Sequence, residues 1–350
     1  MASALQEPAA VTRKRQTNRT IPDCASRRIE ESGLDGYGVV GEIARGGTST
    51  VYLGEHLTSG ERVAIKALHP AYVDRSDMVQ RLLAEHQLAE RARHPGLLEI
   101  HRAAQSAHGI PYLVMEYLDG ESLGAVVDRT ALPIGSIIAI AVQVASAVAA
   151  LHAAGVVHCD LKPDNVFVLY EMGPGGWPRI KVIDYGVARL ADEPPLEDGS
   201  VIGTPVFMPP EQWAGKPTAA SDVYALGCVL YELITGEPLF SGALPQLMAA
   251  HCGRAPTAPM AHCPDLDPAL DALIVRMLAK QPAQRPTMAE VEAALAELAT
   301  LAFGPRPAVA AVAMHAQLAS FTTRDRVERS GEAPGFRPSE MVAPGLEAAG

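Results

Sequence analysis

From residue 37 onward, the chain alternates short apolar runs with glycine-containing turns. The runs cover residues 39–43, 50–55 and 62–68, and a Ser59-Gly60 pair separates the last two. Short apolar runs bounded by turn residues are typical of strands joined as hairpins. This part of the sequence therefore predicts three antiparallel strands.

A helical pattern follows the third run. In residues 77–93, apolar side chains recur near helical spacing, and a His-Pro-Gly sequence then ends the pattern. Two more strand-like runs come next, the second at residues 112–117. Beyond Asp119-Gly120 the pattern is mainly helical, at residues 134–154, 221–236, 269–278 and 288–301.

This order of elements predicts an α+β fold with two lobes. A small antiparallel-sheet lobe with one helix would cover residues 37–115, a hinge residues 116–120, and a larger, mainly helical lobe residues 121–300. Ligands commonly bind between two such lobes. Outside them, residues 1–36 predict a flexible basic leader, and residues 301–350 predict a tail with little fixed structure.

Composition narrows the setting of the protein. Asp and Glu (40) exceed Lys and Arg (29), which gives a formal charge of −11 and argues against a nucleic-acid binder. Five scattered cysteines favour a reducing cytoplasm over a disulfide framework. Polar residues interrupt the longest apolar run, 137–157, so it predicts a buried helix and no membrane span. The N-terminus lacks the continuous apolar core of a signal peptide.

Candidate chemistry is concentrated in the run His158-Cys159-Asp160-Leu161-Lys162-Pro163-Asp164-Asn165 and in Asp184-Tyr185-Gly186. Asp160 is placed to orient a hydroxyl and accept its proton, and Lys162 to neutralise charge on a transferred phosphoryl group. Asn165 and Asp184 offer the oxygen ligands that Mg²⁺ prefers.

Both segments resemble the catalytic loop and the metal-binding loop of the eukaryotic-like protein kinases. One departure is clear, because Cys159 stands where that family usually has arginine. In the family, this arginine binds a phosphorylated residue of the activation loop. Cysteine cannot make that contact, so we expect a kinase of the type without this arginine (non-RD), whose activity does not depend on a phosphate bridged through residue 159.

Residues 43–51, between two predicted strands, carry Gly46 and Gly47. Alone, these glycines fit a plain hairpin turn as well as a phosphate-covering loop. The segment resembles the kinase nucleotide loop, which implies contacts to nucleotide from Ile43, Gly46, Gly47 and Val51. Ala44 and Ser49 replace two of the usual glycines, and we expect Ser49 at the loop tip to loosen the grip on the β-phosphate.

Ala64 and Lys66 share one face of the third predicted strand by its two-residue period. A lysine held there needs a countercharge. Glu85 matches the family's helix glutamate, while Glu90 is the other candidate and better suits a surface charge. The resemblance also implies a gatekeeper at Met115, hinge contacts to adenine from Glu116 and Leu118, and nucleotide contact by Phe167.

Downstream motifs fit the same family. The resemblance implies that Thr204 supports Asp160 and Lys162, that Glu211 pairs with Arg285, and that Asp222 holds the backbone of the catalytic loop. The activation loop carries few hydroxyl groups that could accept phosphate: apart from Tyr185, these are Ser200 and Thr204. It carries four acidic residues, at positions 192, 193, 197 and 198. Those acids provide standing negative charge.

The sequence thus predicts a non-specific serine/threonine protein kinase of bacterial signalling, which uses ATP and Mg²⁺ and acts on protein substrates. Nothing in the tails suggests a sensor, so any input is expected from a regulatory partner protein. A pseudokinase scaffold that binds without turnover is the main alternative, favoured by the altered glycine loop and Cys159. A small-molecule phosphotransferase is disfavoured by Thr204 and by the Met208-Pro209-Pro210-Glu211 segment, which resembles a peptide-binding surface.

Overall fold

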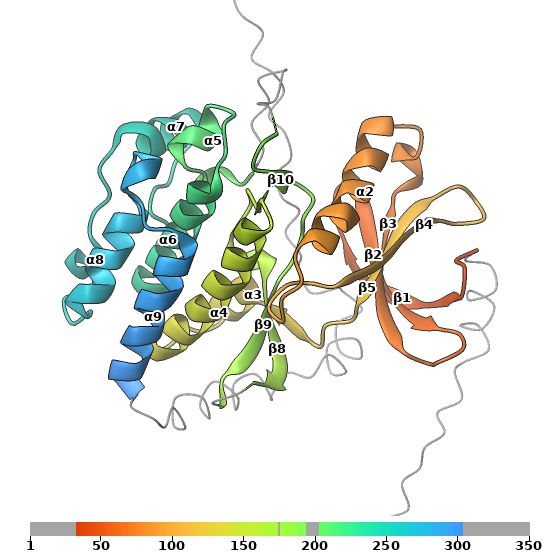
Figure 1. Cartoon of the computed structure of the whole chain (residues 1–350), viewed down its shortest axis with the longest axis horizontal. Coiled ribbons are helices and arrows are strands. Elements are labelled where there is room, and N and C mark those ends of the chain that lie inside the picture. The colour runs from red at the N-terminus through yellow and green to blue at the C-terminus, as the bar shows by residue number, and fades with distance from the viewer. Residues whose placement is uncertain (1–32, 174–175, 194–202, 304–350) are drawn as a thin grey trace, which may run out of the picture.

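Two lobes lie side by side in the computed structural model, which describes residues 33–173, 176–193 and 203–303 (Figure 1). The smaller lobe is a five-stranded antiparallel sheet in the order β1-β2-β3-β5-β4. Its strands are β1 (Tyr37–Arg45), β2 (Ser49–His56), β3 (Arg62–Leu68), β4 (Ile100–Gln105) and β5 (Pro111–Glu116). The predicted strands and the predicted small lobe are confirmed.

Helix α2 (Ser76–Arg91) packs on this sheet and agrees with the predicted helix within two residues at each end. Its buried positions are Leu82, Glu85, Leu88 and Ala89, three or four residues apart. That spacing places them on one face of the helix. The one carboxylate on this apolar face, Glu85, is therefore turned toward the sheet.

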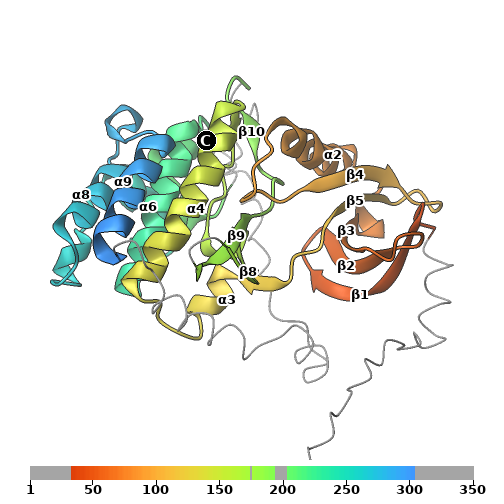
Figure 2. The same ribbon diagram turned by 60° about the horizontal axis from the view of Figure 1, so that its bottom comes forward.

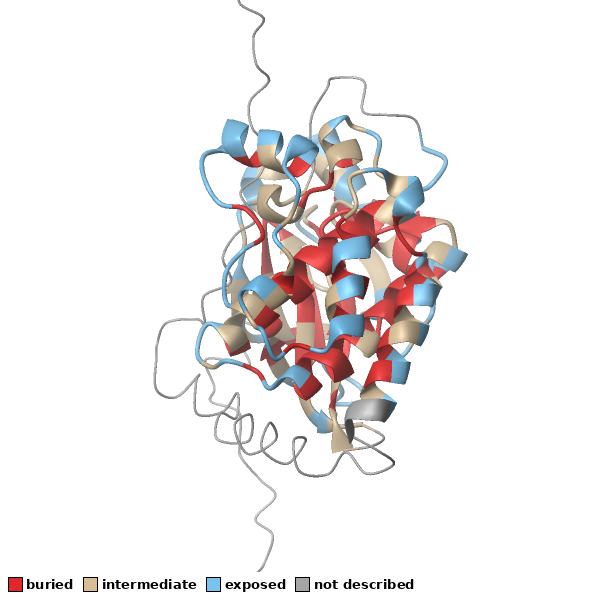
Figure 3. Ribbon diagram, turned by 90° about the vertical axis from the view of Figure 1, so that its left-hand side faces the viewer, coloured by how far each residue is buried: buried red, intermediate tan, exposed pale blue. Residues whose placement is uncertain are grey.

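The larger lobe is mainly helical, as predicted. Its helices are α3 (Leu123–Val127), α4 (Ile134–Ala153), α5 (Pro210–Trp213), α6 (Ala219–Thr235), α7 (Leu244–Gly253), α8 (Pro268–Met277) and α9 (Met288–Phe303). Inner faces of these helices are buried and their outer faces exposed (Figure 3). Short 3-10 turns complete the lobe at Pro163–Asn165, Pro205–Phe207, Pro259–Ala261 and Pro282–Gln284.

Helix α4 runs through the middle of the larger lobe, where it contacts α6, α9 and β9. It is the one helix of the described ranges that is long and apolar enough to cross a membrane, yet most of it is buried inside the protein. The packing explains the apolar composition, since a helix that is apolar all round is buried, here inside the larger lobe. It is the buried helix expected from the sequence.

A three-stranded sheet at the junction of the lobes was not predicted. It contains β6 (Gly120–Ser122), β8 (Val166–Met172) and β9 (Pro178–Val182), and a further pair joins β7 (Val156–Val157) to β10 (Arg189–Leu190) (Figure 2). Gly120 starts β6 against the carbonyl oxygen of Val168, so close that a Cβ atom would collide with it. Strands β6, β7 and β10 are two or three residues long, too short for a periodic pattern to reveal them, and β8 and β9 lie in a part of the chain that was expected to be mainly helical.

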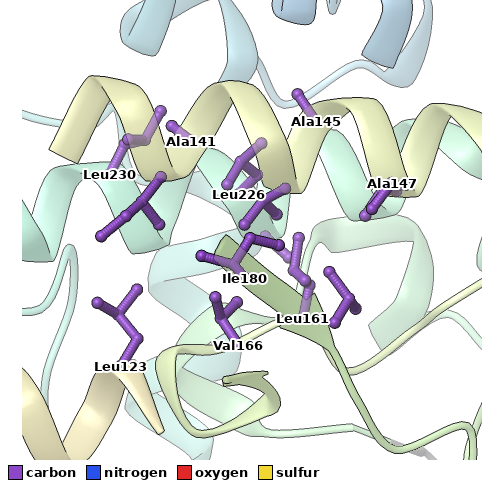
Figure 4. Packing of buried hydrophobic residues seen from close by; sticks show 14 of the residues in the cluster. Leu123, Ala141, Ala145, Ala147, Leu161, Val166, Ile180, Leu226 and Leu230 are labelled. Carbon is purple, nitrogen blue, oxygen red and sulfur yellow. The ribbon is translucent and has the colours of Figure 1, made fainter. Parts of the chain in front are cut away.

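Buried leucine and valine side chains anchor the segment of candidate chemistry to the core. Leu161 and Val166 are 1% exposed and pack among residues of α4 and α6 (Figure 4). Anchoring these two residues fixes the backbone on which Asp160, Lys162 and Asn165 stand. The predicted leader and tail lie outside the described residues, except for residues 33–36 and 301–303.

Candidate active site

Four side chains of the catalytic loop and the following segment form one hydrogen-bonded group. The Thr204 hydroxyl donates to Asp160 Oδ1 at 2.7 Å, and Lys162 Nζ lies 2.9 Å from both Thr204 Oγ1 and Asp160 Oδ2. Asn165 Nδ2 donates to Asp160 Oδ2 at 3.1 Å and to the Asp160 carbonyl oxygen at 2.8 Å. The structure therefore brings together Asp160, Lys162, Asn165 and Thr204, which lie up to 44 residues apart in the chain.

Asp222 of α6 holds the backbone of this loop, as the sequence predicted. Its carboxylate accepts the amides of His158 at 2.8 Å and Cys159 at 2.9 Å, and also bonds to His152 Nε2 at 2.8 Å. Burial alone would raise the pKa of Asp222, but the bond to His152 and the loop amides hold that pKa below its ordinary value. An ionised acceptor thus fixes two consecutive amides.

His158 connects the loop to the strand that precedes Asp184. Its Nδ1 accepts the amide of Asp160 at 3.3 Å, which leaves the proton on Nε2 to donate to the carbonyl oxygen of Ile183 at 3.2 Å. The Asn165 carbonyl accepts the amide of Ile183 at 2.9 Å. These bonds join the two backbone segments that carry the expected metal ligands, Asn165 and Asp184.

A lysine and two carboxylates link the lobes. Lys66 Nζ of β3 lies 2.8 Å from both carboxylate oxygens of Glu85 and 3.5 Å from Asp184 Oδ1. Glu85 is therefore the countercharge, as predicted. Glu90, the other candidate, is at the surface, where its carboxylate lies 3.7 Å from Nδ1 of His86.

The charges of this group oppose the effect of burial. Burial alone would lower the pKa of Lys66, but Glu85 and Asp184 raise it above its ordinary value. Burial raises the pKa of Glu85, and Lys66 only partly offsets this. For Asp184, burial would also raise the pKa, but Lys66 and the Gly186 amide lower it. Lys66 is thus charged at neutral pH with an ionised Asp184 beside it.

Asn165 and Asp184 offer oxygen atoms that suit a divalent cation. Asn165 Oδ1 is buried and has no hydrogen-bond partner within the described ranges, while its Nδ2 is fully used. The described residues hold no group of three His, Cys, Asp or Glu side chains that could bind a metal ion. Mg²⁺ is usually held by one or two carboxylates together with phosphate oxygens, so Asn165 and Asp184 fit that ion.

Four of the apolar residues expected to contact nucleotide lie in the main core or pack against it. Ala64 and Met115 face each other on β3 and β5 and belong to the main core, against which Ile43 and Val51 pack. Leu118 is half-buried in the hinge, and the half-buried Phe167 lies on β8 opposite Lys181.

The glycine-containing turn between β1 and β2 differs from expectation in one respect. Gly46 and Gly47 lie in the turn, and a Cβ atom on Gly47 would meet nothing within 4 Å. Ser49, however, is the first residue of β2, is 9% exposed and pairs with Leu68. The expectation that Ser49 occupies the loop tip was wrong, because the strand starts one residue after Thr48.

One ion pair near the hinge was missed by sequence reasoning. The side chain of Glu116 accepts a bond from Lys181 Nζ of β9 at 2.6 Å and from the Glu99 amide at 2.7 Å. Lys181 also donates to the carbonyl oxygen of Leu97 at 3.0 Å. The partners are 65 residues apart, and β9 was not predicted, so no local signal was available.

The predicted pair of Glu211 and Arg285 is present. Arg285 Nη1 and Nη2 lie 2.6 and 2.9 Å from the two oxygens of Glu211, and the arginine side chain is fully buried. This pair ties α5 to the turn before α9. No hydrogen bond among the described residues joins the pair directly to Asp160, and its role in the larger lobe is structural.

The thiol of Cys159 is buried, and within the described residues its polar contact is a weak one, 3.6 Å from the Val157 carbonyl oxygen. Burial raises its pKa well above the ordinary value. Nearby, Arg189 Nε of β10 lies 3.1 Å from Glu193 Oε2, one of the predicted loop acids. Ser200, Glu197 and Asp198 lie outside the described residues.

A small sheet lobe, a helical lobe and a lysine–glutamate pair next to an Asp-Lys-Asn loop define the architecture of a protein kinase. The protein kinase domain family matches residues 37–294, and the chain belongs to that family. A solved structure of the Mycobacterium tuberculosis PknI kinase domain is similar, with a TM-score of 0.56 and 29% sequence identity over 76% of this chain and 98% of that one.

Curated relatives are bacterial serine/threonine kinases. Serine/threonine-protein kinase Pkn1 of Myxococcus xanthus is 40% identical over 71% of this chain, and PknB of Mycolicibacterium smegmatis is 35% identical over 90% of it. The chain spans 36% of the length of the first and 49% of the second.

Proposed function

We propose that this chain transfers the γ-phosphoryl group of ATP to serine or threonine hydroxyls of protein substrates in bacterial signalling. The observation that carries the proposal is the hydrogen-bonded group of Asp160, Lys162, Asn165 and Thr204, next to the Lys66–Glu85–Asp184 group. Phosphoryl transfer needs a positioned hydroxyl and neutralised phosphate charge more than covalent chemistry. Both requirements can be met by these residues.

Asp160 would orient the acceptor hydroxyl. Lys162, Asn165 and Thr204 all contact its carboxylate, which fixes its position. Its main contribution is therefore geometric. Lys162 would then neutralise charge on the phosphoryl group as it approaches the hydroxyl.

Lys66 would bind phosphate oxygens of ATP from the small lobe, held in place by Glu85. The adenine base would be enclosed by apolar side chains, those of Ile43, Val51, Ala64, Met115, Leu118 and Phe167. Backbone groups of Glu116 and Leu118 would bind its edge. Mg²⁺, bound by Asn165 and Asp184, would neutralise phosphate charge.

A scaffold without turnover is less well supported. A scaffold has no need of a buried amide oxygen without a hydrogen-bond partner beside an ionised aspartate, yet Asn165 and Asp184 provide both. A small-molecule phosphotransferase is disfavoured by the bond from Thr204 to Asp160, which couples the segment before α5 to the catalytic loop.

The test is phosphoryl transfer by the purified chain with Mg²⁺ and labelled ATP, with and without casein as a generic acceptor, followed by phosphoamino-acid analysis. Label on serine or threonine that disappears in Asp160→Asn and Asp184→Asn is expected. ATP binding without label supports the scaffold. ATP consumption that labels no protein would show transfer of the phosphoryl group to water and would contradict the proposal.

We further propose that phosphorylation of the activation loop is not required. A buried Cys159 thiol cannot hold a phosphate, and the pair of Arg189 and Glu193 provides a loop carboxylate in cis. Phosphatase treatment should then leave activity within about twofold. Loss of activity on treatment and recovery with phosphate on Ser200 alone would contradict this.

A reducing cytoplasm suits the chain, since the four cysteines of the described residues are free thiols. Its partners would be protein substrates and, for control, a regulatory protein. Copurification under reducing conditions tests for such a regulator.

A further inference from the structure

The peptide bond between Cys159 and Asp160 is held at both ends. Its N–H, from Asp160, donates to His158 Nδ1 at 3.3 Å, and its carbonyl oxygen, from Cys159, accepts a bond from Gln212 Nε2 at 2.6 Å. A peptide group is planar, so fixing its two polar atoms fixes the plane. The orientation of that plane determines where the Cα atom of Asp160 lies.

Cys159 needs such support because of its backbone conformation. Its φ angle is +65°, in the left-handed region that costs a residue with a side chain roughly 1–2 kcal/mol. A strained conformation persists only where its surroundings over-determine it. Asp222 fixes the amide of Cys159 and Gln212 fixes its carbonyl, while the thiol takes no part.

Gln212 also contacts the segment that carries Thr204. The preceding residue, Gly203, packs across the hydrogen bond: a Cβ atom there would lie 2.8 Å from the Cys159 carbonyl oxygen and closer still to Gln212 Nε2. The φ angle of Gly203 is +123°. Gln212, which is 4% exposed, thus contacts two segments that position Asp160: the Cys159–Asp160 peptide bond and the segment that carries Thr204.

We propose that Gln212 is a positioning residue for phosphoryl transfer, which sets Asp160 through the carbonyl group of Cys159. This proposal rests on the proposed kinase function. The clamp uses only the main chain of residue 159, so it does not depend on which side chain stands at that position.

Gln212→Met tests the clamp, because methionine preserves the length of the side chain but has no N–H donor. We expect kcat with casein to fall by about tenfold, the scale of one buried hydrogen bond, while KM for ATP changes by less than about twofold. The matched control is Gln143→Met. Gln143 of α4 donates to the Ala139 and Pro178 carbonyl oxygens at 3.2 and 3.1 Å, away from Asp160, so its loss should affect melting temperature and leave kcat unchanged.

Gln212→Glu gives a readout that a packing role would not affect. A carboxylate would face the Cys159 carbonyl oxygen without a proton, whereas the protonated acid can donate. Burial raises the pKa of such a carboxyl group. The ratio of its kcat to that of the wild type should therefore rise as pH falls from 8 to 6.

Gly203→Ala should lower kcat by displacing the same amide, and its effect should not add to that of Gln212→Met. If the wild type transfers phosphate and Gln212→Met has the same kcat, the clamp is overturned and the kinase function stands. A wild type that transfers no phosphate overturns both.

Discussion

Breaking the pair of Glu211 and Arg285 should destabilise the larger lobe strongly. The guanidinium group is fully buried and donates five hydrogen bonds: two to Glu211 and three to the carbonyl oxygens of Ala279, Ala220 and Lys280. It also lies 4.8 Å from the ring centre of Tyr224. Glu211→Ala would leave this cation buried without its countercharge.

The size of the effect follows from that burial. Removing one partner of a buried pair costs about 3–5 kcal/mol, because the remaining charge stays away from water. A domain of this size loses about 2–4 °C of melting temperature per kcal/mol. Glu211→Ala should therefore melt about 10 °C below the wild type.

Thermal unfolding followed by circular dichroism measures this. The matched control is Asp77→Ala, which breaks a pair of equal geometry: Arg75 contacts both oxygens of Asp77 at 3.0 Å, but the pair is exposed. Exposed pairs add little, so the control should melt within about 1 °C of the wild type. Adding Arg285→Met to Glu211→Ala should restore part of the loss. A melting temperature for Glu211→Ala within about 2 °C of the wild type would refute the reasoning.

Three further outcomes are expected. Lys66→Met should lower kcat/KM for ATP by at least about a hundredfold in the casein assay, because the phosphates lose the ammonium that Glu85 positions; a loss under tenfold contradicts this. His251 is buried with its pKa lowered to about 4, so its neutral form stabilises the fold above pH 6.5, and this is lost as pH falls toward 4. His251→Asn should therefore lose about 2 kcal/mol less unfolding free energy than the wild type between pH 6.5 and 5, and an equal loss in denaturant melts would show otherwise. Among the described cysteines, a maleimide should label the exposed Cys252 first and Cys159 only on unfolding, and mass spectrometry that finds early Cys159 adducts would be the contrary result.

Long elements with a regular pattern were predictable. Helix α4 was predicted within one residue at its end because eighteen of its twenty residues are apolar or small, which allows little else. Strands β6, β8 and β9 were not predicted. They form by hydrogen bonding to one another, β6 to β8 and β8 to β9. Tertiary pairing, and not local preference, makes them strands.

Predicted pairs could be placed only where a motif marked both partners. Lys66 was marked by a strand face, and Glu85 by its match to the helix glutamate of the kinase family, so their contact was expected. Gln212 and Lys181 stand in runs with no local sign of their partners, and their bonds cross 53 and 65 residues. Such contacts depend on how separate elements pack, which a linear pattern does not contain.

The sequence by itself determined the two-lobed organisation, the residues of the catalytic loop and the replacement of arginine by Cys159, because each depends on residue type and spacing. Tertiary structure alone decided how the loop is held without that arginine. Asp222 from α6 and Gln212 from α5 reach the backbone of Cys159 from opposite sides. Burial makes their hydrogen bonds obligatory, since an unpaired buried amide or carbonyl group is costly.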